Sequence, residues 1–176
     1  MKKLLALLLA LVMVLSMVAC GTSSGGGDTE EDEEDGFSSS VKVAKAYVKA
    51  YASRDASDLL DTLPEFMWDV YADQCDLEEG YTRKELVKAM EEEVDEDDII
   101  NIKIKSAEKS EDYDDDEVEE ILEQLADVYK FDTDDIQKAE IIALECEYKD
   151  GDETEEDSAE VLCVKIDGSW YAITNK

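Results

Sequence analysis

Carboxylates and tyrosines are the side chains of this sequence that could do acid–base chemistry, because it contains no histidine. That lack removes His-based acid–base pairs, Ser-His and Cys-His nucleophile systems and histidine metal ligands. A general base would have to be one of the 49 Asp and Glu residues. Desolvation among aromatic residues could raise the pKa of such a carboxylate, and a tyrosine hydroxyl could stabilise an oxyanion. The aromatic residues considered for this role are Trp68, Tyr71, Tyr81 and Tyr148. Aromatic residues at helical spacing more often form core, so we assign no catalytic residue.

Dense acidic stretches could supply hard oxygen ligands to a metal ion. Calcium needs roughly six to eight oxygens around one point, and EF-hand loops place Gly and Glu at fixed positions. In "DGDETEED" the glycine comes one residue after the first aspartate, which breaks that spacing. We therefore interpret the acidic stretches as solvated turns and expect no metal and no other cofactor. The stretches are residues 95–98, 112–117, 132–135 and 150–157.

Three cysteines, Cys75, Cys146 and Cys163, lie beyond Cys20. An odd number does not describe a disulfide framework. If a hairpin were centred in the acidic turn 150–157, Cys146 and Cys163 would face each other and could form a cross-strand disulfide. A one-residue slip in register would put them on opposite faces of the sheet. The alternative is two buried thiols in the sheet, and Cys75 is interpreted as a buried or half-buried thiol.

Residues 1–19 have the pattern of a signal peptide. Lys2 and Lys3 precede an apolar run from residue 4 to 18 that is shorter than the roughly 20 apolar residues of a membrane-spanning helix. The stretch "MVAC", residues 17–20, resembles a bacterial lipobox. That resemblance implies that Cys20 carries a lipid on its sulfur and becomes the first residue of the mature protein. A plain signal peptide that happens to contain a cysteine is the alternative.

Residues 20–40 are predicted to be an acidic, flexible tether between the lipid anchor and the folded domain. Residues 22–40 hold seven acids, no base and one aromatic residue, too little apolar surface to offset the entropy of ordering. Without Lys2 and Lys3 the 17 basic residues become 15 against 49 acids, a net charge of −34. Nucleic acid is a poor partner for such a chain. We expect it on the extracytoplasmic face of the membrane of a Gram-positive bacterium.

Residues 41–176 have the length of one domain, and their apolar spacing predicts helices first. Ala44, Tyr47, Val48 and Tyr51 recur at i, i+3, i+4 and i+7, which predicts a first helix. Apolar residues from 59 to 71 continue this pattern. Thr62 and Glu65 have capping-box spacing, which predicts a helix restarting with Pro64 in its first turn, or else a kink.

The clearest predicted helix start is Thr82, which has Glu85 three residues later, and this helix is expected to run to about residue 93. The acids at 112–116 favour the beginning of another helix, which should end near residue 130.

Alternating residues predict the strands. Ile100, Ile102 and Ile104 alternate with polar residues, and three more strands are expected at about 138–149, 159–166 and 170–174. The predicted fold is therefore an α+β domain of three to four helices packed on a curved four-stranded antiparallel sheet.

The amphipathic first helix, the second helical pair and the terminal hairpin "CVKIDGSWYAI" resemble the NTF2-like (SnoaL or cystatin-like roll) domains of small Gram-positive lipoproteins. The resemblance covers roughly residues 41–176. It implies a cone whose sheet curls around a cavity. Some members enclose ligands, a few are isomerases or dehydratases, and many have no known reaction. Residues expected to line such a cavity are Tyr47, Tyr51, Trp68 and Tyr71.

The sequence favours a non-catalytic, membrane-anchored binding or accessory module over an enzyme. Its concave face would hold a small apolar ligand or a peptide of a neighbouring envelope protein. An isomerase or hydrolase-like enzyme of the same fold, relying on a carboxylate and a tyrosine, is the alternative. A structural envelope protein with no ligand is the third interpretation. An enzyme needs an enclosed cavity in which a carboxylate faces a hydroxyl or amide group.

Overall fold

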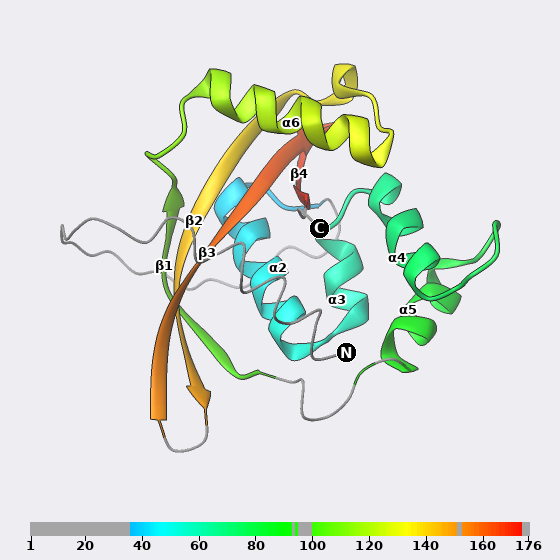
Figure 1. Cartoon of the computed structure of the whole chain (residues 1–176), viewed down its shortest axis with the longest axis horizontal. Coiled ribbons are helices and arrows are strands. Elements are labelled where there is room, and N and C mark those ends of the chain that lie inside the picture. The colour runs from blue at the N-terminus through cyan, green and yellow to red at the C-terminus, as the bar shows by residue number, and fades with distance from the viewer. Residues whose placement is uncertain (1–35, 93, 95–99, 151–152, 174–176) are drawn as a thin grey trace. The chain divides into compact units, whose positions relative to one another are not determined.

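The computed structural model describes residues 36–92, 94, 100–150 and 153–173. These residues form one α+β unit with five α-helices and a four-stranded antiparallel sheet (Figure 1). The α-helices are α2 (Ser40–Ser53), α3 (Ala56–Asp61), α4 (Trp68–Gln74), α5 (Arg83–Glu92) and α6 (Asp115–Tyr129), with 3-10 turns η1 (Glu65–Met67) and η3 (Thr133–Asp135). The strands are β1 (Ile102–Lys109), β2 (Lys138–Asp150), β3 (Glu153–Ile166) and β4 (Ser169–Ile173).

The sheet is a meander in which each strand pairs with the next along the chain, in the order β1-β2-β3-β4. Strands β2 and β3 pair over their whole length, from Lys138 opposite Lys165 to the end of the hairpin. The register of β1 on β2 shifts between Ile104 and Ser106, which marks a bulge. The predicted α+β class with a four-stranded antiparallel sheet is confirmed.

Helices cover both faces of the sheet. Helix α2 contacts all four strands, and α6 contacts β2 (Figure 1). Successive strand residues point to opposite faces. Ile142 and Leu144 of β2 therefore share the face that carries α2, whereas Ile141 belongs to the other face. All three are buried, which requires a packed layer on each side. Burying one such side chain contributes about 1.5–3 kcal/mol.

Side-chain caps fix where the helices begin. Ser39 accepts a hydrogen bond from the Lys42 backbone N–H at 3.2 Å at the start of α2. The predicted start at Thr82 is confirmed, because the Glu85 carboxylate accepts from the Thr82 N–H at 2.8 Å and the Thr82 hydroxyl accepts from the Glu85 N–H. The predicted acidic start of the last helix is also confirmed as a reciprocal cap between Asp114 and Glu117.

The predicted cap at Thr62 is wrong, although the chain becomes helical again directly after Pro64, in η1 and then α4. The described residues form five α-helices instead of the expected three to four. The Thr62 hydroxyl donates to the Leu59 carbonyl at 2.7 Å and therefore closes α3. Pro64 is extended, with φ −68° and ψ 150°, so the chain leaves the helical path there. The apolar stretch from 59 to 71 is consequently divided into α3, η1 and α4.

The folded unit begins at Gly36, earlier than the boundary at residue 41 that the sequence predicts. Phe37 forms an antiparallel bridge with Trp170 at the edge of β4, and the Trp170 N–H donates to the Phe37 carbonyl at 2.9 Å. Gly36 has a φ of 72°, and a Cβ atom there would lie 2.5 Å from the Ser169 Oγ. Glycine fits because this position combines positive φ with close approach. Residues 36–40 therefore belong to the fold and not to the tether.

Candidate functional site

A buried carboxylate holds the beginning of α2 to the sheet. Glu140 of β2 accepts a hydrogen bond from the Ser40 hydroxyl at 2.6 Å and another from the Lys138 ammonium. Desolvation raises the pKa of Glu140, but the hydrogen bonds from Lys138 and Ser40 outweigh it, and the pKa lies below its ordinary value. Glu140 is thus an ionised acceptor at neutral pH. It is suited to holding α2 rather than to exchanging a proton.

The space between α2 and the sheet is filled by side chains. Val43 and Ala44 of α2, Ile142 of β2 and Cys163 of β3 are each fully buried there. The Cys163 thiol contacts the Ser40 carbonyl oxygen, with a sulfur–oxygen distance of 3.5 Å. Side chains therefore occupy the position in which the sequence analysis expects a ligand cavity.

Three tyrosine hydroxyls donate to carboxylates near the surface. Tyr113 bonds Glu160 at 2.8 Å, Tyr81 bonds Asp69 at 2.7 Å, and Tyr148 bonds Glu155 at 2.7 Å. Burial and the hydrogen bond to Glu160 raise the pKa of Tyr113 to about 12, and burial with the bond to Asp69 raises that of Tyr81. Tyr113 and Tyr81 therefore keep their protons at neutral pH, and each of the three hydroxyls is already hydrogen-bonded to a carboxylate.

A hollow of about 440 Å³ lies beside the Tyr113–Glu160 pair, before the start of α6. The Ser110 hydroxyl lies 3.4 Å from the second Glu160 oxygen, and the Lys109 ammonium lies 3.4 Å from Asp115. The hollow therefore brings several carboxylates, two hydroxyls and one ammonium together at the surface. Its lining residues are Lys109, Ser110, Glu111, Tyr113, Asp114 and Asp115.

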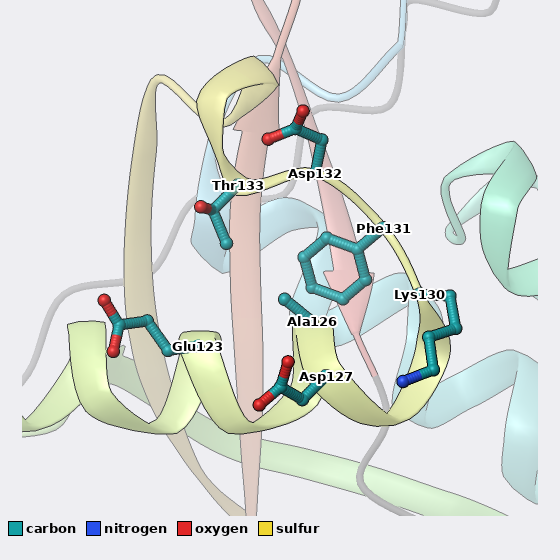
Figure 2. A pocket seen from close by; sticks show the side chains of 7 residues that line it. All are labelled: Glu123, Ala126, Asp127, Lys130, Phe131, Asp132 and Thr133. Atoms are coloured by element: carbon teal, nitrogen blue, oxygen red, sulfur yellow. The ribbon is translucent and has the colours of Figure 1, made fainter.

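A second hollow, of about 490 Å³, lies at the C-terminal end of α6 (Figure 2). Figure 2 shows the Phe131 ring between α6 and the turn that carries Asp132 and Thr133. The Phe131 ring also stacks on Phe66, with centroids 4.4 Å apart. Three carboxylates and one ammonium surround the aromatic ring, so the hollow favours a cationic group with an apolar stem. The full lining is Glu123, Ala126, Asp127, Lys130, Phe131, Asp132 and Thr133.

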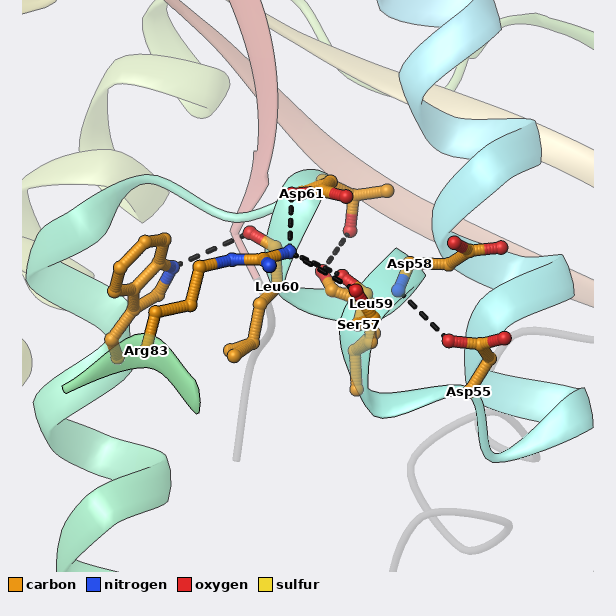
Figure 3. Close-up of polar contacts among 9 residues, drawn as sticks. Asp55, Ser57, Asp58, Leu59, Leu60, Asp61 and Arg83 are labelled. Atoms are coloured by element: carbon orange, nitrogen blue, oxygen red, sulfur yellow. Dashed lines mark hydrogen bonds and ion pairs between the residues drawn. The ribbon is translucent and has the colours of Figure 1, made fainter. Parts of the chain in front are cut away.

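Arg83 joins α5 to α3 (Figure 3). Its guanidinium donates to the Ser57 carbonyl at 3.0 Å and lies 2.5 Å from an Asp61 carboxylate oxygen. Beside it, the Trp68 indole N–H donates to the Leu60 carbonyl at 3.3 Å. Arg83 therefore binds both the first turn of α3 and Asp61 at its end, and Trp68 satisfies a carbonyl in its last turn, which gives both residues structural roles.

The four residues expected to line a cavity lie on two helices. Tyr47 and Tyr51 of α2 are half-buried and their rings stack with centroids 6.1 Å apart. Trp68 and Tyr71 belong to α4 and are also half-buried. Neither pair lines the two hollows described above. Each hollow is lined by one short segment, residues 109–115 or 123–133. Only Glu160, which bonds Tyr113 and Ser110, comes from a distant strand, and no local sequence pattern shows that contact.

The strand register separates Cys146 from Cys163. Cys146 faces Asp157 and Cys163 faces Glu140, so the two cysteines lie six residue pairs apart along the ladder. At about 3.3 Å per residue this exceeds the reach of a disulfide. The expected facing pair is wrong because β2 continues to Asp150 and β3 already begins at Glu153, where the sequence predicts a turn over 150–157. Both cysteines are buried free thiols, and burial raises both pKa values.

Cys20 and residues 1–35 lie outside the described residues, as do residues 95–98 of the first acidic stretch. Within the described part of the chain, no three Asp, Glu or Cys residues gather in a way that could hold a metal ion. No helix there is long and apolar enough to cross a membrane.

Comparison with known proteins gives no match. No protein-family model, curated protein or solved structure matches this chain.

Proposed function

We propose that this chain is an extracytoplasmic lipoprotein, anchored through Cys20, whose folded unit is a non-catalytic binding or accessory module. The observation that carries the second half of this proposal is the filled space between α2 and the sheet, where Val43, Ala44, Ile142 and Cys163 are fully buried. A domain packed in this way offers its outer surface, rather than an interior cavity, to a neighbouring envelope protein. An NTF2-like fold is part of the proposal and is supported by the amphipathic α2 on an antiparallel sheet that ends in a hairpin.

The anchor is tested by mass spectrometry of the N-terminal peptide after expression in a Gram-positive host. We expect the mature chain to begin at Cys20 with a diacylglyceryl group on its sulfur. We expect Cys20→Ala to lose this modification, whereas the control Cys75→Ala keeps it because Cys75 belongs to the folded unit. An unmodified Cys20, or a mature chain that begins elsewhere, would disprove the anchor.

The packed interior is tested with an apolar fluorescent probe. We expect no saturable uptake by the native chain, because buried side chains occupy the space that the probe would fill. Saturable binding that is lost on filling an interior position, for example in Ala44→Leu, would show a ligand cavity instead. The surface variant Lys45→Leu is the matched control, since Lys45 is exposed on the same helix.

A carboxylate- and tyrosine-dependent enzyme is the second candidate, and the hollow beside Tyr113 and Glu160 favours it. It ranks below the first because the Tyr113 hydroxyl already donates a hydrogen bond to Glu160, and burial together with that bond raises the pKa of the phenol to about 12. A screen for isomerase and hydrolase activity on small carbonyl compounds, with Tyr113→Phe as control, tests this candidate. Activity that Tyr113→Phe abolishes would establish it.

A further inference from the structure

Helix α2 carries a row of lysines without partners inside the described unit. Lys42, Lys45 and Lys49 are exposed and recur at i, i+3 and i+7, on the face opposite the buried Val43, Ala44 and Val48. The helix contains no acidic residue, and none of the three lysines forms an ion pair among the residues that the structure describes. We call these three residues the lysine stripe. A concentration of positive charge on one helix is notable in a chain with 49 acids and 17 bases.

Helix α6 carries the opposite pattern. Asp116, Glu120, Glu123 and Asp127 recur at i, i+4, i+7 and i+11 and are exposed. They lie opposite the buried stripe of α6, and the helix contains no lysine or arginine. Like charges at this spacing destabilise a helix, so folding alone does not account for the row. We call these four residues the acidic stripe.

The end of the acidic stripe offers apolar contact as well as charge. Val128 is 65% exposed and follows Asp127 directly. The hollow of about 490 Å³ lies at the same end of the stripe, with Glu123, Asp127 and the apolar Ala126 and Phe131 in its lining (Figure 2). Because a lysine has an apolar stem and a charged head, it can cover Phe131 while its ammonium meets the carboxylates.

The two stripes cannot meet within one molecule. Ser40 at the start of α2 bonds Glu140, on one face of the sheet. Tyr113, just before α6, bonds Glu160, which pairs with Ala143 and so lies on the other face. We propose that the lysine stripe of one copy of this chain docks on the acidic stripe of a second copy.

The lysine stripe is shorter than the acidic stripe and fits along it. At 1.5 Å per residue the lysine stripe spans roughly 10 Å and the acidic stripe roughly 16 Å. The contact is heterologous, since each copy uses α2 toward one neighbour and α6 toward another, and it can therefore extend into a row. The net negative charge of the chain opposes this association, so the contact is weak and forms where copies are crowded. It goes beyond the proposed function and does not depend on the lipid anchor.

Zero-length crosslinking tests the contact on the full chain in detergent. Unlabelled and isotope-labelled chains are mixed and treated with a carbodiimide, which joins a lysine amine to a carboxylate that touches it. We expect crosslinked peptides that join residues 40–53 of one isotope to residues 115–129 of the other. Raising the salt from about 0.05 M to about 0.5 M should lower their yield at least about five-fold, because the contact is exposed.

Charge reversal separates this contact from general attraction. Lys45→Glu/Lys49→Glu and Glu120→Lys/Glu123→Lys should each lower the yield of the mixed-isotope crosslink at least about five-fold, and mixing the two variants should restore it. Lys84→Glu/Lys103→Glu reverses two exposed lysines elsewhere and should leave the yield unchanged. Circular dichroism checks that each variant is folded. The proposal would be overturned if every crosslink from the lysine stripe joined peptides of the same isotope, which would place it within one molecule. It would also be overturned if mixing the two variants failed to restore the yield.

Discussion

Removing the Ser40 hydroxyl should destabilise the fold by about 2 kcal/mol at neutral pH. Its hydrogen bond to the buried, ionised Glu140 is 2.6 Å long, and hydrogen bonds to charged groups contribute about 1.5–3 kcal/mol. The Lys138 side chain is 57% exposed, so its bond to the same carboxylate is screened and contributes about 0–1 kcal/mol. We therefore expect Ser40→Ala to cost more than Lys138→Ala in urea unfolding of the full chain.

The pH dependence of this loss identifies the carboxylate as its source. The pKa of Glu140 is lower in the folded protein than in the unfolded chain. Its ionised form therefore stabilises the fold above the ordinary carboxyl pKa of about 4.3, and this contribution disappears as the pH falls through the lower folded pKa. The effect of Ser40→Ala should shrink with it, toward the roughly 1 kcal/mol of a neutral hydrogen bond.

Ser39→Ala is the matched control for this experiment. Ser39 caps α2 by accepting from the Lys42 N–H, and loss of such a cap costs about 1 kcal/mol. That interaction involves no titrating group, so Ser39→Ala should cost the same stability at pH 7 and in acid. The reasoning is refuted if Ser40→Ala changes stability by less than about 0.5 kcal/mol at pH 7, or if its effect does not decrease in acid.

Three further predictions concern backbone fit, capping and thiol reactivity. Gly36→Ala should destabilise the fold by about 2 kcal/mol or more, because φ is positive and the new Cβ would meet Ser169. Gly168→Ala is the control and should cost less, because Gly168 also has a positive φ but no neighbour near its Cβ position. Equal losses of stability in thermal unfolding would contradict the steric argument. Asp114→Ala should cost about 1 kcal/mol by removing the cap of α6, measured by urea unfolding; an unchanged midpoint would show that the cap does not hold the helix. Without reductant, Cys75 should be alkylated before Cys146 and Cys163, whose burial raises their pKa values. All three should react after unfolding, and intact mass checks this count; a pair that resists alkylation without reductant would contradict the strand register.

Local signals predicted those parts of the fold that depend on neighbours in the sequence. The reciprocal caps at Thr82–Glu85 and Asp114–Glu117 could be found because each motif is complete within four residues. Thr62 and Glu65 have the same spacing but do not cap a helix. There the Thr62 hydroxyl bonds the carbonyl of Leu59 in the preceding helix, a choice that spacing alone does not determine.

Long-range pairing explains what the sequence analysis missed. Strand β3 begins at Glu153, although the acidic residues that follow are typical of a turn. Glu155 accepts from Tyr148 across the hairpin, and Glu156 accepts from Lys105 of β1. These bonds extend the ladder through an acidic segment and move the turn away from its expected centre. The same difference in register is the reason why Cys146 and Cys163 do not face each other.

The bridge between Phe37 and Trp170 also determines how the unit would respond to a mechanical load. A pull on the chain ahead of Gly36 would first act on the backbone bond between these residues at the edge of β4, and on the Phe37 side chain, which packs against the core. This bridge can break on its own, without breaking the hydrogen bonds between the four strands of the sheet. The next resistance is the bond from Ser40 to Glu140, which involves a buried charge. Under modest tension, residues 36–39 should therefore detach from β4 before the rest of the domain unfolds.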